Sequence, residues 1–317
     1  METNKNNVAV VIVTYNSEDE IELCLTSAIN QRKNISQEII VVDNQSQDNT
    51  VNIIKEKFPE VKLIEPKENL GFAKGVNLGV DNANAEYVLL LNPDTEVRDQ
   101  AVDIVYEFAV KNPQYGLYGG RTLTPEGGLE PSSCWGEPTL WSMACFAFGL
   151  TTLAPRNSLL DPESLGGWER DSIREVGVIT GCFLLVSKPA WEELSGLDET
   201  YFMYGEDADF AIRARKLGYK PVICPKAEVV HEVGMSSVTP THKTLLLYRG
   251  KATLMRSHWN GTRKNIGLFL LASGTFLRAG VSKVLSIIKP KSNYDKWPEV
   301  WKKRREWLQG YGSQINE

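Results

Sequence analysis

The chain has 317 residues, of which 42% are hydrophobic and 24% charged, an ordinary composition for a folded protein with a sizeable core. Its five cysteines are scattered and never spaced as CxxC, so neither a disulfide framework nor a zinc site is indicated, and a reducing compartment fits best. The opening METNKNN leads into a strand-like run and does not read as a secretory leader.

Charge is distributed unevenly along the chain. The net charge is −5, yet residues 243–317 hold 15 Lys and Arg against 4 Asp and Glu, while residues 1–242 hold 20 against 36. An anionic surface would therefore attract only the C-terminal part of the chain.

The first hundred residues alternate between strand and helix patterns. The apolar run at 8–14 predicts a strand buried on both faces, and further strands are expected at 38–42, 61–64 and 87–91. Helices are expected between and after them at 17–30, 48–58, 72–84 and 99–111, the first opened by a Ser17–Glu20 capping box. This alternation predicts βαβ units and a parallel sheet.

The remaining chain is less regular. Residues 116–177 are rich in Gly, Pro, Ser and Trp and are predicted to form loops and short elements over one face of the sheet. Strands are then expected at 178–187 and 219–223, with helices at 189–194 and 206–217. After residue 241 the pattern is helical, basic and aromatic. Its apolar stretch at 266–277 is too short for a membrane span and suits a buried or interfacial helix.

Polar residues follow the predicted strands at the edge where parallel sheets bind ligands. Asp43 ends the second strand, where it could accept a hydrogen bond from a pyrimidine ring N–H while Tyr15 packs on the base. The alternative is a helix-capping Asp in a turn. No GxGxxG follows the first strand, which argues against a dinucleotide oxidoreductase.

Asn92-Pro93-Asp94 follows the fourth strand and places one carboxylate at the sheet edge. A diphosphate bound through Mg²⁺ or Mn²⁺ needs few protein ligands, because phosphate oxygens and waters fill the octahedral shell. An ordinary type I turn is the competing interpretation.

Residues 69–77 (NLGFAKGVN) form a glycine-containing helix entry with one lysine. Its backbone amides could face phosphate, with Lys74 adding positive charge. The alternative is a plain turn-to-helix junction with a solvated lysine.

Residues 201–210 (YFMYGEDADF) crowd Glu206, Asp207 and Asp209 at one helix N-terminus after an aromatic and glycine run. The helix dipole favours carboxylates there, and Asp209 can pair with Arg213 at i,i+4. Three carboxylates beside four aromatic residues further suggest a sugar-binding wall and a general base.

His231 is one of only three histidines and follows a predicted strand. It could complete a metal site with Asp94, although a lone histidine is more often structural.

Taken in order, these segments resemble family 2 glycosyltransferases of the GT-A fold, and most of all the bacterial rhamnosyltransferase branch that builds O-antigen and related wall polysaccharides. Ordered matches are more specific than any one of them. The matching stretches are VVIVTYNS (10–17), VVDNQSQDNT (41–50), ENLGFAKGVNLG (68–79), LLLNPDT (89–95), ITGCFLLVSK (179–188), GLDETYFMYGEDADFAIRARKLGY (196–219) and VVHEVGMSS (229–237).

The resemblance implies an α/β fold of the GT-A type, Rossmann-like, with a mostly parallel central sheet flanked by helices and a basic helical C-terminal appendage. Residues 1–240 would form the transferase domain, with a nucleotide-binding half over about 1–120 and an acceptor half over about 121–240. Residues 241–317 would serve membrane association or oligomerisation.

The resemblance also implies residue roles. Asp207 would be the catalytic base with Glu206 beside it, and Asp94 and His231 would hold Mg²⁺ or Mn²⁺. One acidic residue of the family's DxD motif is replaced by Asn92, which predicts weaker metal binding. Cys182 would sit near a sugar, and the nucleotide-sugar would be bound by Tyr15, Asp43, Lys74, Asn77, Asn92, Asp94 and Gly181.

The expected reaction is inverting transfer of a sugar from a dTDP- or UDP-linked donor to a hydroxyl of a lipid-linked or cell-envelope glycan. L-Rhamnose from dTDP-rhamnose is the first expectation. A UDP-hexose or UDP-HexNAc transferase and a non-catalytic sugar-nucleotide-binding subunit are the alternatives.

The basic tail predicts a cytoplasmic protein that is peripheral on the inner face of the plasma membrane. Packing of the tail on the body or in a homo-oligomer is the competing interpretation. No nucleic-acid recognition motif is present.

Overall fold

The structure is a computed structural model that describes residues 6–31, 33–231, 239–288 and 296–312. The chain divides into two compact units. Unit 1 comprises Met1–Trp135, Glu169–Phe202 and Asp207–Ser237, and unit 2 comprises Gly136–Trp168, Met203–Glu206 and Val238–Glu317. This division differs from a boundary near residue 240, because 136–168 groups with the C-terminal helices.

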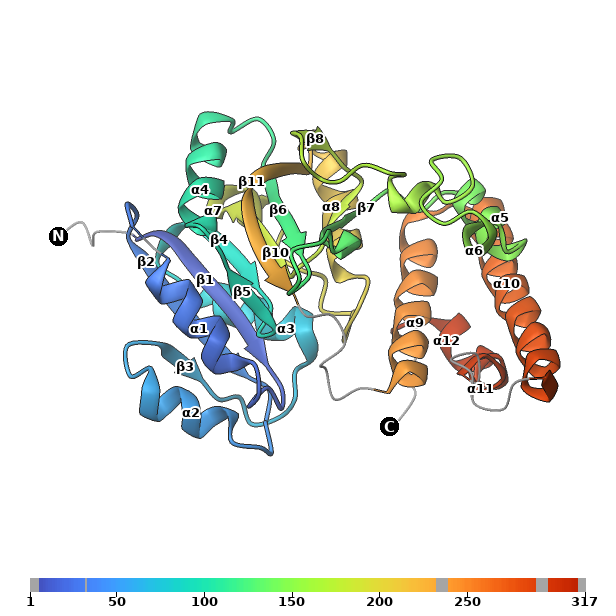
Figure 1. Ribbon diagram of the computed structural model, residues 1–317, viewed down its shortest axis with the longest axis horizontal. Helices are drawn as coiled ribbons and strands as arrows, with labels where there is room; N and C mark the ends of the chain where they lie inside the picture. The colour runs from blue at the N-terminus through green and yellow to red at the C-terminus, as the bar shows by residue number, and fades with distance from the viewer. Residues whose placement is uncertain (1–5, 32, 232–238, 289–295, 313–317) are drawn as a thin grey trace. The chain divides into compact units, whose positions relative to one another are not determined.

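Unit 1 is built on a nine-stranded sheet with the order β3-β2-β1-β4-β10-β6-β11-β5, to which β8 adds beside β11 (Figure 1). Its strands are β1 (Asn6–Thr14), β2 (Gln37–Asp43), β3 (Lys62–Ile64), β4 (Ala85–Leu91), β5 (Thr95–Val97), β6 (Leu117–Leu123), β8 (Arg174–Glu175), β10 (Phe183–Ser187) and β11 (Val222–His231). A separate two-stranded sheet pairs β7 (Cys134–Trp135) with β9 (Val178–Ile179).

The sheet is mostly parallel, as predicted. β3, β2, β1 and β4 are parallel neighbours, and β6 is parallel to β11. β10 is antiparallel to both β4 and β6, and β5 is antiparallel to β11. The carboxyl ends of β1, β2, β4, β6 and β11 therefore meet at one edge of the sheet.

Helices cover both faces of the sheet because β1 buries side chains on alternate sides. Val8, Val10 and Ile12 belong to one core with α1 and α4, while Val11 and Val13 lie against Gly79 and Gly75 of α3. A Cβ on Gly79 would lie 2.5 Å from Val11 Cγ1, so this close approach requires glycine. The unit's helices are α1 (Ile21–Asn30), α2 (Thr50–Lys57), α3 (Gly71–Asp81), α4 (Ala101–Lys111), α7 (Lys188–Glu193) and α8 (Glu206–Lys216), of which only the first residue is assigned to unit 2.

The start of the first helix differs from the prediction. α1 begins at Ile21, and Glu20 is its N-cap residue without a side-chain cap. The Ser17 carbonyl accepts the backbone N–H groups of Glu20 and Ile21 instead, so a backbone turn replaces the expected capping box. The Glu20 side chain therefore does not cap the helix.

The prediction that 116–177 holds only loops and short elements was wrong for β6, which lies inside the sheet. Its sequence LYGGRTL has a glycine pair that weakens any strand pattern. Both glycines are needed for packing, since a Cβ on Gly119 would lie 2.6 Å from Ile179 Cγ2 and one on Gly120 2.4 Å from the Ala227 carbonyl oxygen.

Two predicted strands also have different bounds. The run 178–187 is two strands, β9 and β10, interrupted at residues 180–182. The strand expected at 219–223 is β11, which extends to His231 across a register shift between Ile223 and Glu228.

Unit 2 is helical, with α5 (Leu140–Ala147), α6 (Leu150–Leu153), α9 (Pro240–His258), α10 (Gly261–Ile288), α11 (Lys296–Lys302) and α12 (Arg304–Gln309). Its core is rich in aromatic and methionine side chains, namely Met143, Tyr248, Met255, Trp259, Leu271, Val300 and Trp307. The buried Trp307 indole N–H donates to the Val300 carbonyl at 2.8 Å, which satisfies its one polar atom.

The helix that contains the apolar stretch is longer than the sequence pattern indicated. By length and composition alone, residues Gly261–Leu285 of α10 could cross a membrane, with a mean hydropathy of 1.4 and 28% of the apolar window buried within the protein. No other helix in the described ranges meets that test.

Candidate active site

Asp94 and His231 meet because β5 pairs with β11. The antiparallel register sets Thr95 opposite His231, so the residue before β5 lies beside the last residue of β11. His231 Nε2 is 3.1 Å from Asp94 Oδ1, and both side chains are largely buried. No sequence pattern predicts β5, a strand of three residues, although the pairing of Asp94 with His231 was expected.

Each of these two side chains retains a buried polar atom without a hydrogen bond. Asp94 Oδ1 and His231 Nδ1 are both fully covered: the 3.1 Å contact of Asp94 Oδ1 with His231 Nε2 lacks the geometry of a hydrogen bond, and His231 Nδ1 has no hydrogen-bond partner among the described residues. Unsatisfied buried polar atoms are rare and costly, and at a strand edge they indicate a group that binds a ligand.

The interruption between β9 and β10 brings residues 180–182 to the same place. The backbone N–H of Asn92 donates to the Cys182 carbonyl at 3.2 Å, which continues the β4–β10 pairing to the Asn-Pro-Asp turn. The pKa of the Cys182 thiol is raised to about 12, mainly by burial and to a smaller extent by the negative charges of Asp94 and Asp207. Cys182 is therefore a neutral thiol within electrostatic reach of both carboxylates.

Asp207 stands in the first turn of α8, where its Oδ1 accepts the backbone N–H of Ala208 at 2.7 Å. Burial raises its pKa from 3.8 to about 6, while hydrogen bonds from the backbone of Ala208, Asp207 and Gly181 act in the opposite sense. A carboxylate poised near neutral pH suits a general base. Its bond to the Gly181 backbone places the expected sugar-binding glycine at this carboxylate.

The carboxylates on either side of Asp207 differ from it. Glu206 opens α8 and is buried. Asp209 pairs with Arg213 at 2.7 Å, as its i,i+4 spacing predicted. Arg213 also donates to the carbonyls of Leu194 and Gly196, so the Asp209–Arg213 ion pair anchors the turn at residues 194–196.

Asp43 is buried at the end of β2, and its carboxylate is already occupied. Its Oδ1 accepts the hydroxyls of Thr14 and Ser46, and its Oδ2 accepts the Ser46 backbone N–H at 2.9 Å. This is the turn chemistry that the sequence left open as an alternative. Tyr15, next to Thr14, is 46% exposed beside that strand end.

The glycine-containing helix entry packs directly on the segments that carry the site. A Cβ on Gly71 would lie 2.4 Å from the Phe202 carbonyl oxygen, and one on Gly181 would lie 3.0 Å from Phe72 Cζ. Asn44 fixes the entry, because its side chain donates to the Gly71 carbonyl and accepts the Leu70 N–H. The backbone of this entry therefore lies against the segments before Phe183 and Asp207.

The two other residues expected from this segment are not gathered with Asp94 and Asp207. Lys74 is exposed on α3, and no hydrogen bond or ion pair in the described ranges joins it to these carboxylates. The Asn77 amide is engaged elsewhere, since it accepts the Leu197 N–H at 3.0 Å and donates to the Leu197 carbonyl at 2.9 Å.

Two residues near the site could not be predicted from the sequence. The pKa of Glu20 is raised by burial and then by the negative charge of Asp94, so the carboxyl at the N-cap of α1 lies within electrostatic reach of Asp94. In unit 2, Tyr311 Oη donates to the Met203 carbonyl at 2.6 Å, which fixes the segment that directly precedes Asp207. Glu20 is far from Asp94 in the sequence, and Tyr311 is far from Met203.

Comparison with known proteins decides the family. The profile of the family described as "Glycosyl transferase family 2" matches residues 9–166. The chain is 31% identical over 240 residues to an N-acetylglucosaminyl-diphospho-decaprenol L-rhamnosyltransferase of Mycobacterium tuberculosis, covering 72% of this chain and 76% of that one. This chain is a family 2 glycosyltransferase. The glycosyltransferase is also 24% identical over 301 residues to the low-salt glycan biosynthesis hexosyltransferase Agl10 of Haloferax volcanii, covering 92% of this chain and 89% of that one.

Solved structures support the GT-A fold of this glycosyltransferase. The mannosyltransferase PcManGT of Pyrobaculum calidifontis, solved with GDP-Man and Mn²⁺, matches with a TM-score of 0.54 at 16% identity over 97% of this chain and 84% of that one. Residues 1–349 of S. aureus TarS match with a TM-score of 0.52 at 16% identity, covering 95% of this chain and 81% of that one. The predicted fold class is confirmed.

Enzymes of the GT-A type typically use a divalent metal, and the pair Asp94–His231 fits one. Two ligands in neighbouring positions of an octahedral ion at about 2.1 Å are roughly 3.0 Å apart, close to the separation found between Oδ1 and Nε2. No group of three His, Cys, Asp or Glu side chains suited to a metal occurs in the described residues. Two protein ligands suffice for a glycosyltransferase only if donor phosphates and water supply the others. Residues 232–237 of the VVHEVGMSS motif lie outside the described residues.

Proposed function

We propose that this glycosyltransferase transfers L-rhamnose from dTDP-rhamnose, with inversion, to a hydroxyl of a lipid-linked or cell-envelope glycan precursor. The observation that carries the catalytic part is the gathering of Asp94, His231, Cys182 and Asp207 at one edge of the sheet. The sugar rests on the relative that is 31% identical and named an L-rhamnosyltransferase.

Asp207 is the base of the proposed reaction. Its carboxylate takes the proton of the acceptor hydroxyl as that oxygen forms a bond to the anomeric carbon, and the bond to the diphosphate oxygen breaks with its electron pair leaving on the nucleotide. One displacement inverts the anomeric configuration without an enzyme nucleophile. A base with a pKa of about 6 is ionised at neutral pH and still accepts a proton effectively.

Asp94 and His231 would hold Mg²⁺ or Mn²⁺, which when bound neutralises charge on the departing diphosphate. Glu20 supports this assignment, because the negative charges of Asp94, Asp19 and Asp48 add to burial in raising the pKa of its carboxyl. A cation would relieve this repulsion. The neutral Cys182 thiol adds no charge beside Asp207 and leaves the base as the proton acceptor of the reaction.

The nucleotide would lie over the ends of β1 and β2. Tyr15 supplies an exposed ring for packing on the base, and Asp43 has one lone pair of Oδ2 left after its bonds to Thr14 and Ser46. The backbone around Gly71 and Phe72 would face the diphosphate, and Lys74 would move to it on binding.

The proposed acceptor would bring the enzyme to a membrane. The acceptor part of the proposal follows the relative whose name includes a diphospho-decaprenol, a lipid carrier. Because all five cysteines are free and buried, we place the protein in a reducing compartment, the cytoplasm, peripheral on the inner face of the plasma membrane.

The test is a donor screen on the full chain with Mn²⁺. dTDP-rhamnose, UDP-galactose, UDP-GlcNAc and GDP-mannose are each supplied with a prenyl-diphosphate-linked GlcNAc acceptor, and nucleotide release and lipid-linked product are measured. We expect dTDP-rhamnose to give product. Asp207→Asn should lower kcat by roughly 10²–10⁴-fold, the usual contribution of a general base. Asp81→Asn, an exposed carboxylate at the end of α3, should leave kcat unchanged.

Each other outcome selects a different function. Product from a UDP-hexose or UDP-HexNAc alone would replace rhamnose as the donor sugar, in line with the hexosyltransferase relative. Full activity in Asp207→Asn would remove Asp207 as the base. Binding of donors without any product would make the chain a non-catalytic sugar-nucleotide-binding subunit.

A further inference from the structure

Helix α10 of unit 2 has one face that is tightly packed within the unit. A Cβ on Gly267 would lie 2.4 Å from Trp259 Cζ3, and one on Gly274 would lie 2.5 Å from Phe146 Cε1. Arg278, in the middle of the helix, donates to the Phe146 carbonyl at 2.8 Å. This face therefore belongs to the protein core and is not free to meet lipid.

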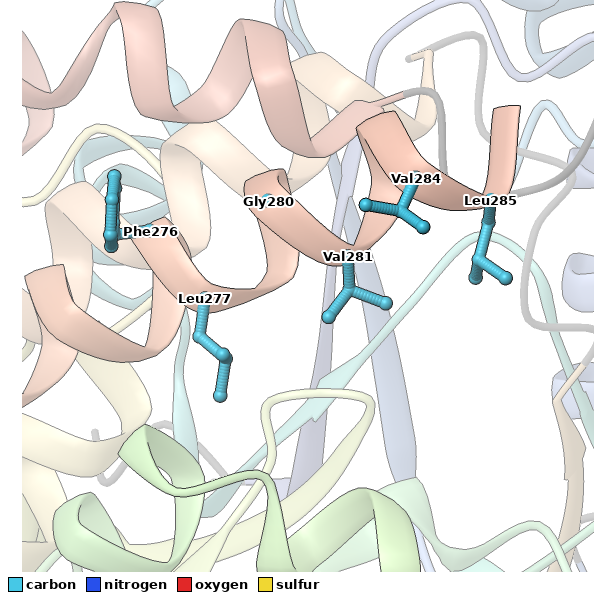
Figure 2. A pocket seen from close by; sticks show the side chains of 6 residues that line it. All are labelled: Phe276, Leu277, Gly280, Val281, Val284 and Leu285. Atoms are coloured by element: carbon cyan, nitrogen blue, oxygen red, sulfur yellow. The ribbon is translucent and has the colours of Figure 1, made fainter. Parts of the chain in front are cut away.

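The opposite face of α10 is apolar and exposed. Phe269 is 69% exposed and Val284 59%, and four further large apolar side chains on the helix are exposed with them, Ile266, Phe276, Leu277 and Val281. Figure 2 shows Leu277, Val281 and Leu285, spaced four residues apart, pointing to the same side of α10. A shallow hollow on this face is lined by α10 alone, through Phe276, Leu277, Gly280, Val281, Val284 and Leu285.

Exposed apolar side chains are concentrated in unit 2. Single exposed apolar residues are normal on any protein, and unit 1 has a few of them on separate elements. A continuous strip along several turns of one helix is different, because contiguous apolar patches mark interaction surfaces. We name this strip, made of Ile266, Phe269, Phe276, Leu277, Val281 and Val284, the α10 strip.

Charge selects the occupant of the α10 strip. Residues 261–288 contain Arg263, Lys264, Arg278 and Lys283 and no acidic residue. The chain from residue 243 onward holds 15 basic against 4 acidic residues. A second copy would bring an equally basic surface against this one, which is unfavourable, whereas anionic lipid headgroups complement it.

The packed face decides the depth of insertion. A helix that spans a bilayer must be apolar around its full circumference or packed on other spans, but α10 is packed on one side against helices of unit 2. Basic residues near both ends, Arg263 and Lys264 at one and Lys283 at the other, suit a helix that lies in the plane of the interface.

We propose that the α10 strip docks in the plane of an anionic lipid bilayer, with its apolar side chains among the acyl chains and the flanking lysines and arginines at the phosphates. The inference rests on this surface and not on the donor sugar or the base, so the transfer reaction could fail its test while the docking stands.

The test compares two triple variants of the full chain. Phe269→Gln, Val281→Gln and Val284→Gln together remove three exposed side chains of the strip, and Leu23→Gln, Val110→Gln and Leu217→Gln remove three of similar exposure from unit 1. Co-sedimentation with phosphatidylcholine vesicles that contain phosphatidylglycerol is measured without substrate. We expect the strip variant to lose partitioning about 30-fold, about 2 kcal/mol at 1.4 kcal/mol per tenfold, and the unit 1 variant to match the unaltered chain. Circular dichroism and unfolding confirm that both variants are folded.

A site-specific probe reports insertion directly. All five native cysteines are buried, so Phe269→Cys or Leu23→Cys supplies the one exposed thiol for an environment-sensitive dye. The emission of dye at position 269 should shift to the blue on anionic vesicles, whereas the emission of dye at position 23 should not, and high salt should release the protein from the vesicles.

Equal partitioning of both triple variants would overturn the proposal. A second result would also overturn it. If light scattering shows a dimer that only the strip variant abolishes, and the unaltered chain does not bind vesicles, the α10 strip is a subunit contact. Resistance to salt extraction with detergent-dependent release would contradict in-plane docking and favour a span.

Discussion

Two carboxylates at the same edge of the sheet differ in how fully their neighbours satisfy them with hydrogen bonds. Asp43, at the end of β2, receives hydrogen bonds from Thr14 and from both the hydroxyl and the backbone N–H of Ser46. Asp94, after β4, has its buried Oδ1 3.1 Å from His231 Nε2, and this oxygen accepts no hydrogen bond from the described residues. A carboxylate that is satisfied by its own fold contributes to stability, whereas one left unsatisfied is held ready for a ligand.

The largest effect expected from this contrast is on activity. Asp94→Ala or His231→Ala should each lower kcat/KM by roughly 100-fold, because charge on the leaving diphosphate is no longer neutralised. Steady-state kinetics over a Mn²⁺ titration measure this. EDTA should abolish the unaltered enzyme's activity and Mn²⁺ should restore it. Glu96→Gln, on β5 and paired with the exposed Arg98, is the matched control and should keep near-normal kinetics. Full activity in Asp94→Ala would remove Asp94 from the site.

The pH profile sharpens the contrast for Asp207. Because the reaction needs the ionised carboxylate and burial raises its pKa to about 6, kcat/KM should be level above that pH and fall about tenfold per pH unit below it. A profile of kcat/KM measured with constant ionic strength checks this. The residual activity of Asp207→Asn should lack this acidic limb; if the limb persists unchanged, another group titrates there.

For Asp43 we expect the main loss in stability. Asn in place of Asp43 would present an NH₂ group where the hydroxyls or N–H of Thr14 and Ser46 donate, and the unfolding free energy should fall by about 1–3 kcal/mol. Urea unfolding measures this change. Asp81→Asn should leave the midpoint unchanged. A stable Asp43→Asn enzyme with a greatly raised KM for the donor would show that Asp43 acts mainly on the nucleotide.

The smallest predicted effect is a gain in stability when the Asp207 carboxylate is removed. Asp207 binds its proton more tightly in the folded than in the unfolded chain, so its ionisation lowers stability as pH rises from about 3.8 through about 6. Asp207→Asn should therefore raise Tm by roughly 2–4 °C at pH 8 and have little effect at pH 4. Differential scanning calorimetry at the two pH values checks both. A Tm that falls at pH 8 would mean that the carboxylate is stabilised by its backbone donors.

Much of the fold follows from local patterns, but the contacts in the site do not. The apolar runs of β1, β2 and β4 and the helices between them have the periodicity that identifies them. β6 was missed because its glycine pair lacks side chains that a pattern could report, and the need for those glycines arises from Ile179 and Ala227. The expected pairing of Asp94 and His231 depends on β5, whose three residues are too few to show a period.

The same limit applies to residues that change their role with context. Glu20 fits a capping box in sequence, yet α1 begins only at Ile21, and the Glu20 carboxyl instead lies within electrostatic reach of Asp94. Asn77 lies in a stretch that matches the family, while its amide is bonded to Leu197. Hydrogen-bond partners more than a hundred residues apart leave no trace in a single sequence.

The hydrogen bond from Tyr311 to the Met203 carbonyl bears on how the protein should be trimmed or tagged. A shortened chain that ends before residue 311 would lose the only described side-chain anchor of Met203, four positions ahead of Asp207. A drop in turnover after such trimming would then be mistaken for loss of lipid contact. Fusion partners and affinity handles belong at the amino end, and surface substitutions on α10 are a cleaner route than truncation for separating adhesion from chemistry.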